Sequence, residues 1–257
     1  EHEFPRLGLV HYRNVYDPTQ IVADVLAAIS RAKDEVVDAD GYAALAFAML
    51  RAATTAEERA TAERALEVAR VYAAYEALKQ RVHRVDFGDL VSLPVRLLER
   101  DAAVRAHLGG LYDHVLVDEY QDVNRASVRL LAALRADGRN LWAVGDGKQS
   151  VYRFRGASSF NMARFGTADF AGGARGQLTT NYRSVEAVVD ACSAFAREMR
   201  AGRSGSGLRA ERGTSAHAPE LATVLRAEQQ PVALADAIEA MRQAGHPYRD
   251  QAVLCTG

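Results

Sequence analysis

The stretch HVLVDEYQD at residues 114–122 decides the fold of this chain, together with the stretch GDGKQSVYRFRGA at residues 145–157. The apolar run at 115–117 stops at two acids, and the apolar run at 141–144 stops at a glycine and an acid. Continuous apolar runs of this length predict parallel strands that are covered on both faces. Ligands of α/β sheets bind beyond the carboxyl ends of such strands. The polar residues after each run are therefore the candidate site.

The acids Asp118 and Glu119 are predicted to act on a magnesium-bound triphosphate. Mg²⁺ takes hard oxygen ligands and keeps several waters, so a strand-end carboxylate such as Asp118 suits it. Glu119 can orient and deprotonate the water that attacks a γ-phosphate. Asp146 ends the second strand, and Gln149 follows it as a hydrogen-bonding group placed to contact that phosphate. An isolated Asp-Glu pair is most often a solvated turn, but two such strand ends together favour a nucleotide site.

Aromatic and arginine side chains alternate directly after this second strand end, in the run Tyr152-Arg153-Phe154-Arg155. Aromatic rings stack on bases, and arginines contact the backbone of single-stranded nucleic acid. A nucleotide site and a nucleic-acid surface would then share one loop. This combination is typical of a motor protein.

The composition is that of an ordinary globular protein. The 257 residues are 49% apolar and 25% charged, and the formal net charge is −1. Nucleic-acid binding must therefore be local. No apolar run approaches the roughly 20 residues of a membrane span. Cys192 and Cys255 lack metal-ligand spacing and are predicted to be buried thiols in a reducing compartment.

Residues 1 to about 100 have a helical pattern. A helix is predicted to start at Asp17-Pro18, with a buried stripe of Ile21, Val25 and Ile29 that Val22 and Leu26 widen. Thr55 and Glu58 fit a capping box at the start of a long helix.

From about residue 110 the pattern is α/β. A helix is predicted from about Asn124, a weak strand at 177–179, a helix capped by Ser184 and a linker at 201–219. Strands at 221–225 and 252–255 should flank a helix at 231–244.

Gly-Lys occurs once, at 147–148, and a glutamine follows it, so these residues contain no G-x-x-x-x-G-K-[ST] phosphate loop. The sequence begins without Met and stops in an expected strand. We therefore expect an internal fragment of a longer protein.

Three stretches resemble the UvrD/Rep/PcrA group of superfamily 1 DNA helicases. VDEYQD (117–122) resembles motif II, GDGKQSVYRFRGA (145–157) motif III and LTTNYRS (178–184) motif IV of that group. VDFGDL (85–90) resembles a further segment of the group, although Gly88 stands where an acid is commoner. We assign that segment no chemistry.

The resemblance implies an α/β fold with a RecA-like (P-loop NTPase) parallel-sheet core, here incomplete, and a largely helical 1B-like subdomain. Residues 1–100 would be the helical insertion and its return. Residues 101–205 would be the C-terminal part of the first RecA-like domain (1A). Residues 206–257 would be a linker and the truncated start of the second RecA-like domain (2A).

The resemblance also implies a role for each matched residue. The catalytic set would be Asp118, Glu119, Gln149 and Arg183, with Asp118 and Glu119 at the metal, Gln149 on the γ-phosphate and Arg183 as an arginine finger. The nucleotide would contact Gln121, Asp146 and Tyr182, the last by stacking on adenine. DNA would contact Tyr152, Phe154 and Arg155. The group more often has Trp where Phe154 stands.

Together with the strand-end acids and the aromatic–arginine run, the resemblance implies an ATP- and Mg²⁺-dependent 3′-to-5′ DNA helicase or translocase of the bacterial cytoplasm. Its partners would be single-stranded DNA, the duplex junction and repair or recombination proteins. The fragment itself would be inactive because it lacks the Walker A loop. Two alternatives remain open: a non-hydrolysing DNA-binding or regulatory relative of the same fold, and a Mg²⁺-dependent phosphohydrolase without motor function.

Overall fold

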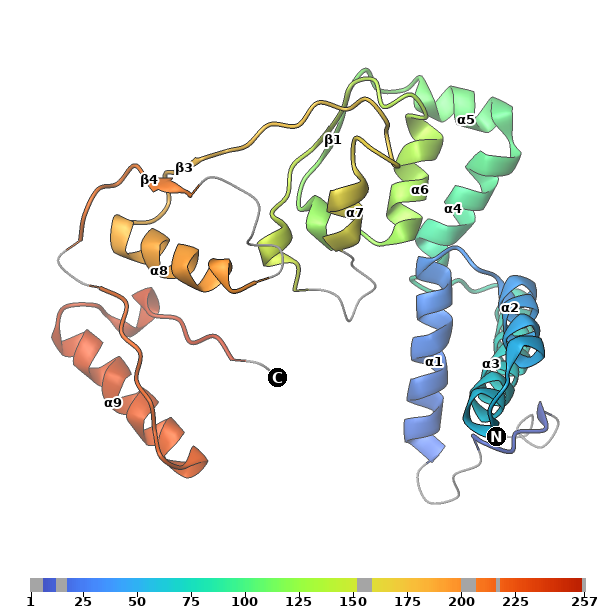
Figure 1. Ribbon diagram of the computed structural model, residues 1–257, viewed down its shortest axis with the longest axis horizontal. Helices are drawn as coiled ribbons and strands as arrows, with labels where there is room; N and C mark the ends of the chain where they lie inside the picture. The colour runs from blue at the N-terminus through green and yellow to red at the C-terminus, as the bar shows by residue number, and fades with distance from the viewer. Residues whose placement is uncertain (1–6, 13–17, 152–158, 200–206, 216–217, 256–257) are drawn as a thin grey trace. The chain divides into compact units, whose positions relative to one another are not determined.

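The computed structural model describes residues 7–12, 18–151, 159–199, 207–215 and 218–255. They belong to two compact units, Glu1–Gln177 and Leu178–Gly257 (Figure 1). The first unit is mostly helical and holds a small parallel sheet. The second combines helices with another short parallel pair. This architecture is compatible with part of the predicted α/β domain.

The elements of the first unit are α1 (Pro18–Asp34), α2 (Ala39–Ala52), α3 (Ala56–Arg81), α4 (Asp89–Arg100), α5 (Ala102–Gly109), β1 (Val115–Val117), η2 (Tyr120–Asp122), α6 (Arg125–Leu134), β2 (Leu141–Ala143), η3 (Gly147–Gln149) and α7 (Ser159–Arg164). Those of the second unit are β3 (Thr180–Asn181), α8 (Glu186–Arg197), β4 (Arg209–Ala210), η6 (Ala227–Gln229), α9 (Gln230–Gln243) and η7 (Tyr248–Asp250).

The helices α1, α2 and α3 share a core that confirms the predicted helical pattern. Ile21, Val25 and Ile29 are buried on α1 and pack with Val68 and Tyr72 of α3. The capping box at the start of α3 is also confirmed, since its two residues exchange the predicted hydrogen bonds. The predicted width of the α1 stripe is wrong, because Val22 and Leu26 are each 43% exposed.

A group of charges, of which Lys33, Lys79 and Asp89 are buried and Glu76 and Asp86 half-buried, joins α1 and α3 to the start of α4. We call these five residues the lysine–acid cluster. The Lys33 Nζ lies 2.6 Å from Asp86 Oδ2, 2.7 Å from Asp89 Oδ1 and 2.8 Å from Glu76 Oε1. The Lys79 Nζ contacts the same three carboxylates. Two of the cluster's acids, Asp86 and Asp89, belong to the VDFGDL segment to which sequence alone assigned no chemistry.

The chain backbone comes very close to this cluster at Gly88. A Cβ on Gly88 would lie 2.7 Å from Lys33 Cδ and 3.0 Å from Lys33 Cβ. Because the Lys33 ammonium is held by three carboxylates, its side chain has little freedom to withdraw. A residue without a side chain therefore allows this close contact.

The strands β1 and β2 pair in parallel, with Val115, Leu116 and Val117 beside Leu141, Trp142 and Ala143. Both strands were predicted, but the expectation that they are covered on both faces is wrong. Leu116 is 77% exposed and its neighbour Trp142 is 64% exposed. Among the described residues only two strands form this sheet, and one of its faces is left uncovered.

The second unit departs from the predictions in several places. The weak strand lies at 180–181 rather than 177–179, and it pairs in parallel with β4, which falls inside the predicted linker. Residues 221–225 and 252–255 are not strands. The start of α8 carries no side-chain cap from Ser184; instead Asn181 Oδ1 accepts the Ser184 N–H at 2.8 Å.

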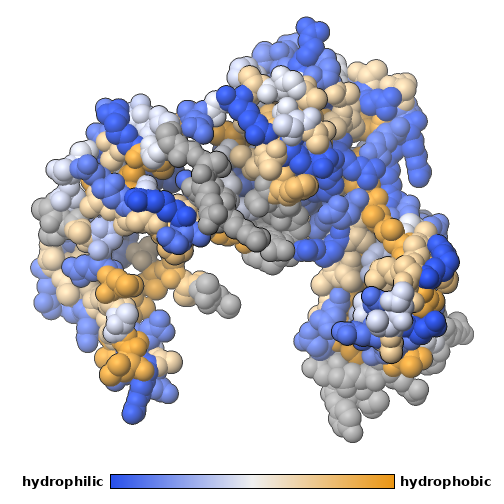
Figure 2. Space-filling view, viewed as in Figure 1, coloured by the Kyte–Doolittle hydropathy of each residue, from blue (hydrophilic) through white to orange (hydrophobic). Residues whose placement is uncertain are grey.

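Much of the second unit's apolar surface is exposed. Both cysteines are exposed rather than buried. Leu221, Leu225 and Leu254 are each more than 90% exposed, and Figure 2 shows apolar patches at the surface over the α9 region. The predicted α9 is confirmed at 230–243. Across the described ranges of both units, no helix combines the length and apolar character that crossing a membrane demands.

Candidate functional site

The two predicted strand ends lie at the same edge of the β1–β2 sheet. The strands are parallel, so both chains leave the sheet on one side. Two backbone hydrogen bonds keep them together beyond the strands: Val144 N donates to Val117 O, and Tyr120 N donates to Val144 O, both at 2.9 Å. Asp118 and Glu119 are thereby brought beside Gly145 and Asp146.

Glu119 adopts a left-handed backbone conformation, with φ 51° and ψ 41°. This region is costly for a residue with a Cβ. The conformation turns the chain sharply from β1 into η2 and leaves both Asp118 and Glu119 exposed. The Glu119 N–H donates to Asp118 Oδ1 at 2.9 Å, which fixes the first carboxylate against the turn.

Gln121 links the two strand ends. Its side chain is 1% exposed. Its Nε2 donates to Glu119 Oε2 at 2.7 Å, and its Oε1 accepts the Asp146 N–H at 2.9 Å. A Cβ on Gly145 would lie 2.6 Å from Gln121 Oε1 and 3.0 Å from Tyr120 N. The glycine is therefore needed for the two turns to come this close.

The turn after β2 is organised by Asp146. Its Oδ1 accepts the Lys148 N–H at 3.0 Å, and its Oδ2 accepts from Gln149 Nε2 at 3.1 Å. The Ser150 hydroxyl donates to Gln121 O at 3.2 Å. Gln149 itself is exposed, so its amide can reach a ligand beyond the strand ends.

An aromatic and ionic support lies beneath this site, and sequence analysis missed it. Tyr120 is buried, and its ring packs edge-on against Phe165 at 5.2 Å between centroids. Burial raises the pKa of Tyr120 to about 12. Asp169 receives two hydrogen bonds from Arg125, at 2.7 and 2.9 Å, and another from Arg164. These bonds lower the pKa of Asp169 and hold α7 against the start of α6. A single aspartate in a glycine-rich loop gives no sequence signal for such a role.

The structure thus brings five predicted residues into one hydrogen-bonded group: Asp118, Glu119, Gln121, Asp146 and Gln149. Tyr182 and Arg183 belong to the second unit. Tyr182 is 73% exposed there, and Arg183 O accepts from Arg212 Nη1 at 2.9 Å. Their placement beside a nucleotide stays a prediction. The predicted DNA-binding residues Tyr152, Phe154 and Arg155 lie outside the described residues.

The donor set at the strand ends fits Mg²⁺ better than the lysine–acid cluster does. Asp118 and Glu119 offer exposed carboxylate oxygens, which are the hard ligands that this ion takes while it keeps its waters. Glu76, Asp86 and Asp89 also bring oxygens within 4.8 Å of one another. Two lysine ammonium groups already lie among those oxygens, so a cation there would be repelled.

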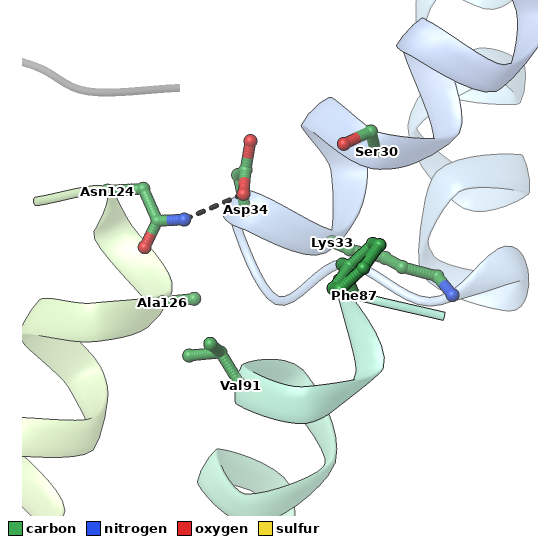
Figure 3. Close-up of a pocket in the computed structure, with 8 residues that line it drawn as sticks. Ser30, Lys33, Asp34, Phe87, Val91, Asn124 and Ala126 are labelled. Atoms are coloured by element: carbon green, nitrogen blue, oxygen red, sulfur yellow. Dashed lines mark hydrogen bonds between the residues drawn. The ribbon is translucent and has the colours of Figure 1, made fainter. Parts of the chain in front are cut away.

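A cavity of about 260 Å³ lies away from the strand ends, between α1, α4 and α6 (Figure 3). Ser30, Asp34, Phe87 and Asn124 contribute to its wall, and Asn124 Nδ2 donates to Asp34 Oδ1 at 2.7 Å. Figure 3 shows the Lys33 ammonium pointing away from Asn124 and Ala126. The cavity includes none of the strand-end acids, and we assign it no part in the site.

Comparison with known proteins identifies the family. The model of the UvrD/REP helicase N-terminal domain matches residues 10–169. The ATP-dependent DNA helicase PcrA of Leuconostoc citreum is 35% identical over 181 residues, which is 70% of this chain and 22% of that protein. PcrA of Staphylococcus aureus is 30% identical over 199 residues, 73% of this chain and 26% of that protein.

The protein named ATP-dependent DNA helicase UvrD2 in Mycobacterium bovis is 34% identical over 194 residues, 74% of this chain and 26% of that protein. The chain thus spans about a quarter of the length of these relatives. Residues 10–169, which the family model matches, are more than half of the chain and carry the five strand-end residues. The chain belongs to the UvrD/REP helicase family.

Proposed function

We propose that this chain is part of an ATP-dependent 3′-to-5′ DNA helicase or translocase that moves on single-stranded DNA. The observation that carries the proposal is the hydrogen-bonded group at the strand ends, in which Glu119 is joined through Gln121 to Asp146, and Asp146 to Gln149. A hydrolase needs its base and its phosphate-contacting group on one rigid frame. Similarity to proteins named ATP-dependent DNA helicases supports the same conclusion.

In this proposal the exposed carboxylate of Asp118, with Glu119 beside it, would hold Mg²⁺, which would supply charge neutralisation at the phosphates. Glu119 orients the attacking water and takes its proton. Gln149 contacts the γ-phosphate, and Asp146 fixes the turn that presents Gln149. From the second unit, Tyr182 would stack on the adenine and Arg183 would neutralise charge on the transferred group.

The proposed domain assignment follows the predicted one, with a RecA-like core. Residues 1–100 would be the 1B-like insertion, and the separate core shared by α1 and α3 supports it. Residues 101–205 would belong to domain 1A, and 206–257 would lead into domain 2A. DNA would contact Tyr152, Phe154 and Arg155. The relatives come from bacteria, which supports a bacterial origin, and a cytoplasmic location is part of the same proposal.

The test uses the complete gene product that contains this chain. Its hydrolysis of Mg-ATP should be stimulated by single-stranded DNA, and it should unwind a duplex that carries a 3′ tail but not one that carries a 5′ tail. Glu119→Gln should lower kcat by about 10²–10⁴-fold. Glu57→Gln, an exposed acid on α3, is the matched control and should leave kcat unchanged.

A complete gene product without DNA-stimulated hydrolysis, or a Glu119→Gln variant with the original kcat, would refute the proposal. The 257 residues contain no Walker A loop. We therefore expect this chain alone to hydrolyse ATP negligibly, which an assay of the purified chain checks.

A further inference from the structure

The amide of Gln121 makes its hydrogen bonds within the protein, and its Nε2 also lies 3.4 Å from Asp122 Oδ2. The side chain is 1% exposed, its Nε2 donates to Glu119 Oε2 at 2.7 Å, and its Oε1 accepts the Asp146 N–H at 2.9 Å. The two partners also fix which way the amide faces, because a backbone N–H can only donate and an ionised carboxylate can only accept. Gln121 therefore contacts both strand ends in one defined orientation.

No other side chain of this size can make the same two bonds. A glutamate at 121 would keep the acceptor for Asp146 but would place a second carboxylate against Glu119. An asparagine is one methylene shorter and cannot span both partners. A leucine fills the space but offers neither bond, so the part-buried Asp146 N–H would lose its partner.

The surroundings of Gln121 are also specific to this position. Gly145 leaves the space for Oε1, since a Cβ there would lie only 2.6 Å away. The backbone of Gln121 is held separately, by the Ser150 hydroxyl on its carbonyl at 3.2 Å. The side chain is thus packed in place beneath the exposed carboxylate of Glu119.

We propose that Gln121 is a positioning residue that holds the Glu119 carboxylate against the Asp146–Gln149 turn. It acts through these neighbours rather than by touching nucleotide, which differs from the contact expected from sequence. The role rests on the proposed function: the proton-accepting group on one strand end and the phosphate-contacting group on the other keep a fixed separation through this one amide.

The kinetic test compares three variants of the complete gene product. Gln121→Leu should lower kcat for DNA-stimulated ATP hydrolysis by about 10–100-fold, as for other residues that orient a catalytic group, and should leave KM for ATP within about threefold. Gln121→Glu should lower kcat similarly, because it cannot donate to Glu119. Gln80→Leu, at an exposed position on α3, is the control.

A double-mutant cycle shows whether the effect passes through Glu119. In the Glu119→Gln background the added Gln121→Leu change should alter kcat by less than about twofold, since residues that act as a unit are not additive. A merely structural role would lower kcat in both backgrounds and would also raise KM.

Amide hydrogen exchange at Asp146 provides a readout that does not depend on activity. Gln121→Leu should remove the protection of this N–H, whereas Gln121→Glu should keep it while kcat falls. If the wild-type protein is active, the proposal is overturned by an unchanged kcat in Gln121→Leu or Gln121→Glu. It is also overturned if the effects of Gln121→Leu and Glu119→Gln on kcat are fully additive. If the wild-type protein does not hydrolyse ATP, the proposed function is refuted, and the hydrogen-exchange result alone decides the role of Gln121. Unchanged protection of the Asp146 N–H in Gln121→Leu then overturns that role. Protection that is lost in Gln121→Leu but kept in Gln121→Glu supports it.

Discussion

The Lys33 ammonium lies 2.7 Å from Asp89 Oδ1, which ties the last turn of α1 to the first turn of α4 across 56 positions of sequence. The side chains of Lys33 and Asp89 are only 4% and 6% exposed. Buried ions of opposite charge that also share hydrogen bonds depend strongly on one another, since removing one leaves the other unpaired in a poor solvent.

Replacing Lys33 by Met should therefore destabilise the protein substantially. Lys79 would remain as the cation for three carboxylates, and we expect the free energy of unfolding to fall by about 3–5 kcal/mol. Urea denaturation measures it. Arg51→Met, at an exposed site on α2, should change stability by no more than about 0.5 kcal/mol. A loss below about 1 kcal/mol for Lys33→Met would show that the cluster does not hold α1 to α4.

The same cluster predicts a stability that falls in acid. Burial alone would raise the pKa of Asp86 and Asp89, but hydrogen bonds from Lys33 and Lys79 lower both below their usual range. A lowered folded-state pKa means that the unfolded chain binds protons first. The stabilisation is therefore present at neutral pH and is lost as the pH falls below about 4 towards the folded-state values.

At the alkaline end of the pH range, the two lysines should make the stability fall as the pH rises. Burial would lower the pKa of Lys33 and Lys79, but the carboxylates raise both. The contribution of these lysines to stability is present below about pH 10.4 and is lost as the pH rises through their folded-state pKa values.

Urea denaturation across the acid range measures how the free energy of unfolding depends on pH. This dependence should be weaker in Lys33→Met than in the wild type. Equal slopes of stability against pH in the two proteins would show that the lysine–acid cluster is not the cause of the pH dependence.

Gly88→Ala should destabilise the protein because its new methyl group has no room. The Cβ would meet Lys33 Cδ at 2.7 Å, and a crowded insertion of this kind costs about 1–3 kcal/mol. Gly176→Ala is the matched control, since nothing lies within 4 Å of the Cβ position there. Thermal and urea unfolding measure the loss of stability in the two variants. Equal losses in Gly88→Ala and Gly176→Ala would contradict this account.

Thr55→Ala should cost about 1 kcal/mol by removing the cap of α3. Glu58 N donates to Thr55 Oγ1 at 3.1 Å, and Glu58 Oε2 accepts the Thr55 N–H at 3.1 Å. Thr61→Ala, an exposed site within the same helix, should lie within about 0.5 kcal/mol of wild type. Circular dichroism followed during urea titration measures both, and equal losses would mean that the cap contributes nothing of its own.

The strand ends could be predicted because their signal is local. An apolar run that stops at charged residues fixes both the strand and the edge of the sheet at which the chain leaves it. The positions of Asp118, Glu119 and Asp146 at the strand ends therefore follow from a few neighbouring residues. The start of α6 at Asn124 has a similar local cause, since its side chain accepts the Ser127 N–H.

Contacts between distant segments could not be predicted in the same way. Gln121 resembles any other polar turn residue until Gly145 and Asp146 are placed against it. Lysine is rarely buried. Burial of Lys33 and Lys79 is possible because three carboxylates pair with both ammonium groups, and these acids lie far from Lys33 in the sequence. The exposure of Leu116 likewise depends on which layers cover the sheet, which a strand's own composition does not specify.

The left-handed backbone at Glu119 and the hydrogen bond that its side chain accepts have opposite effects on stability. A glycine at this position would relieve a conformational cost on the order of 1 kcal/mol. It would also remove the 2.7 Å acceptor of the buried Gln121 amide, a loss of about 1–3 kcal/mol. The same change deletes the carboxylate that the turn exposes. The bond from Gln121 thus offsets the cost of the left-handed turn, and the glutamate carries its own compensation for the backbone that exposes it.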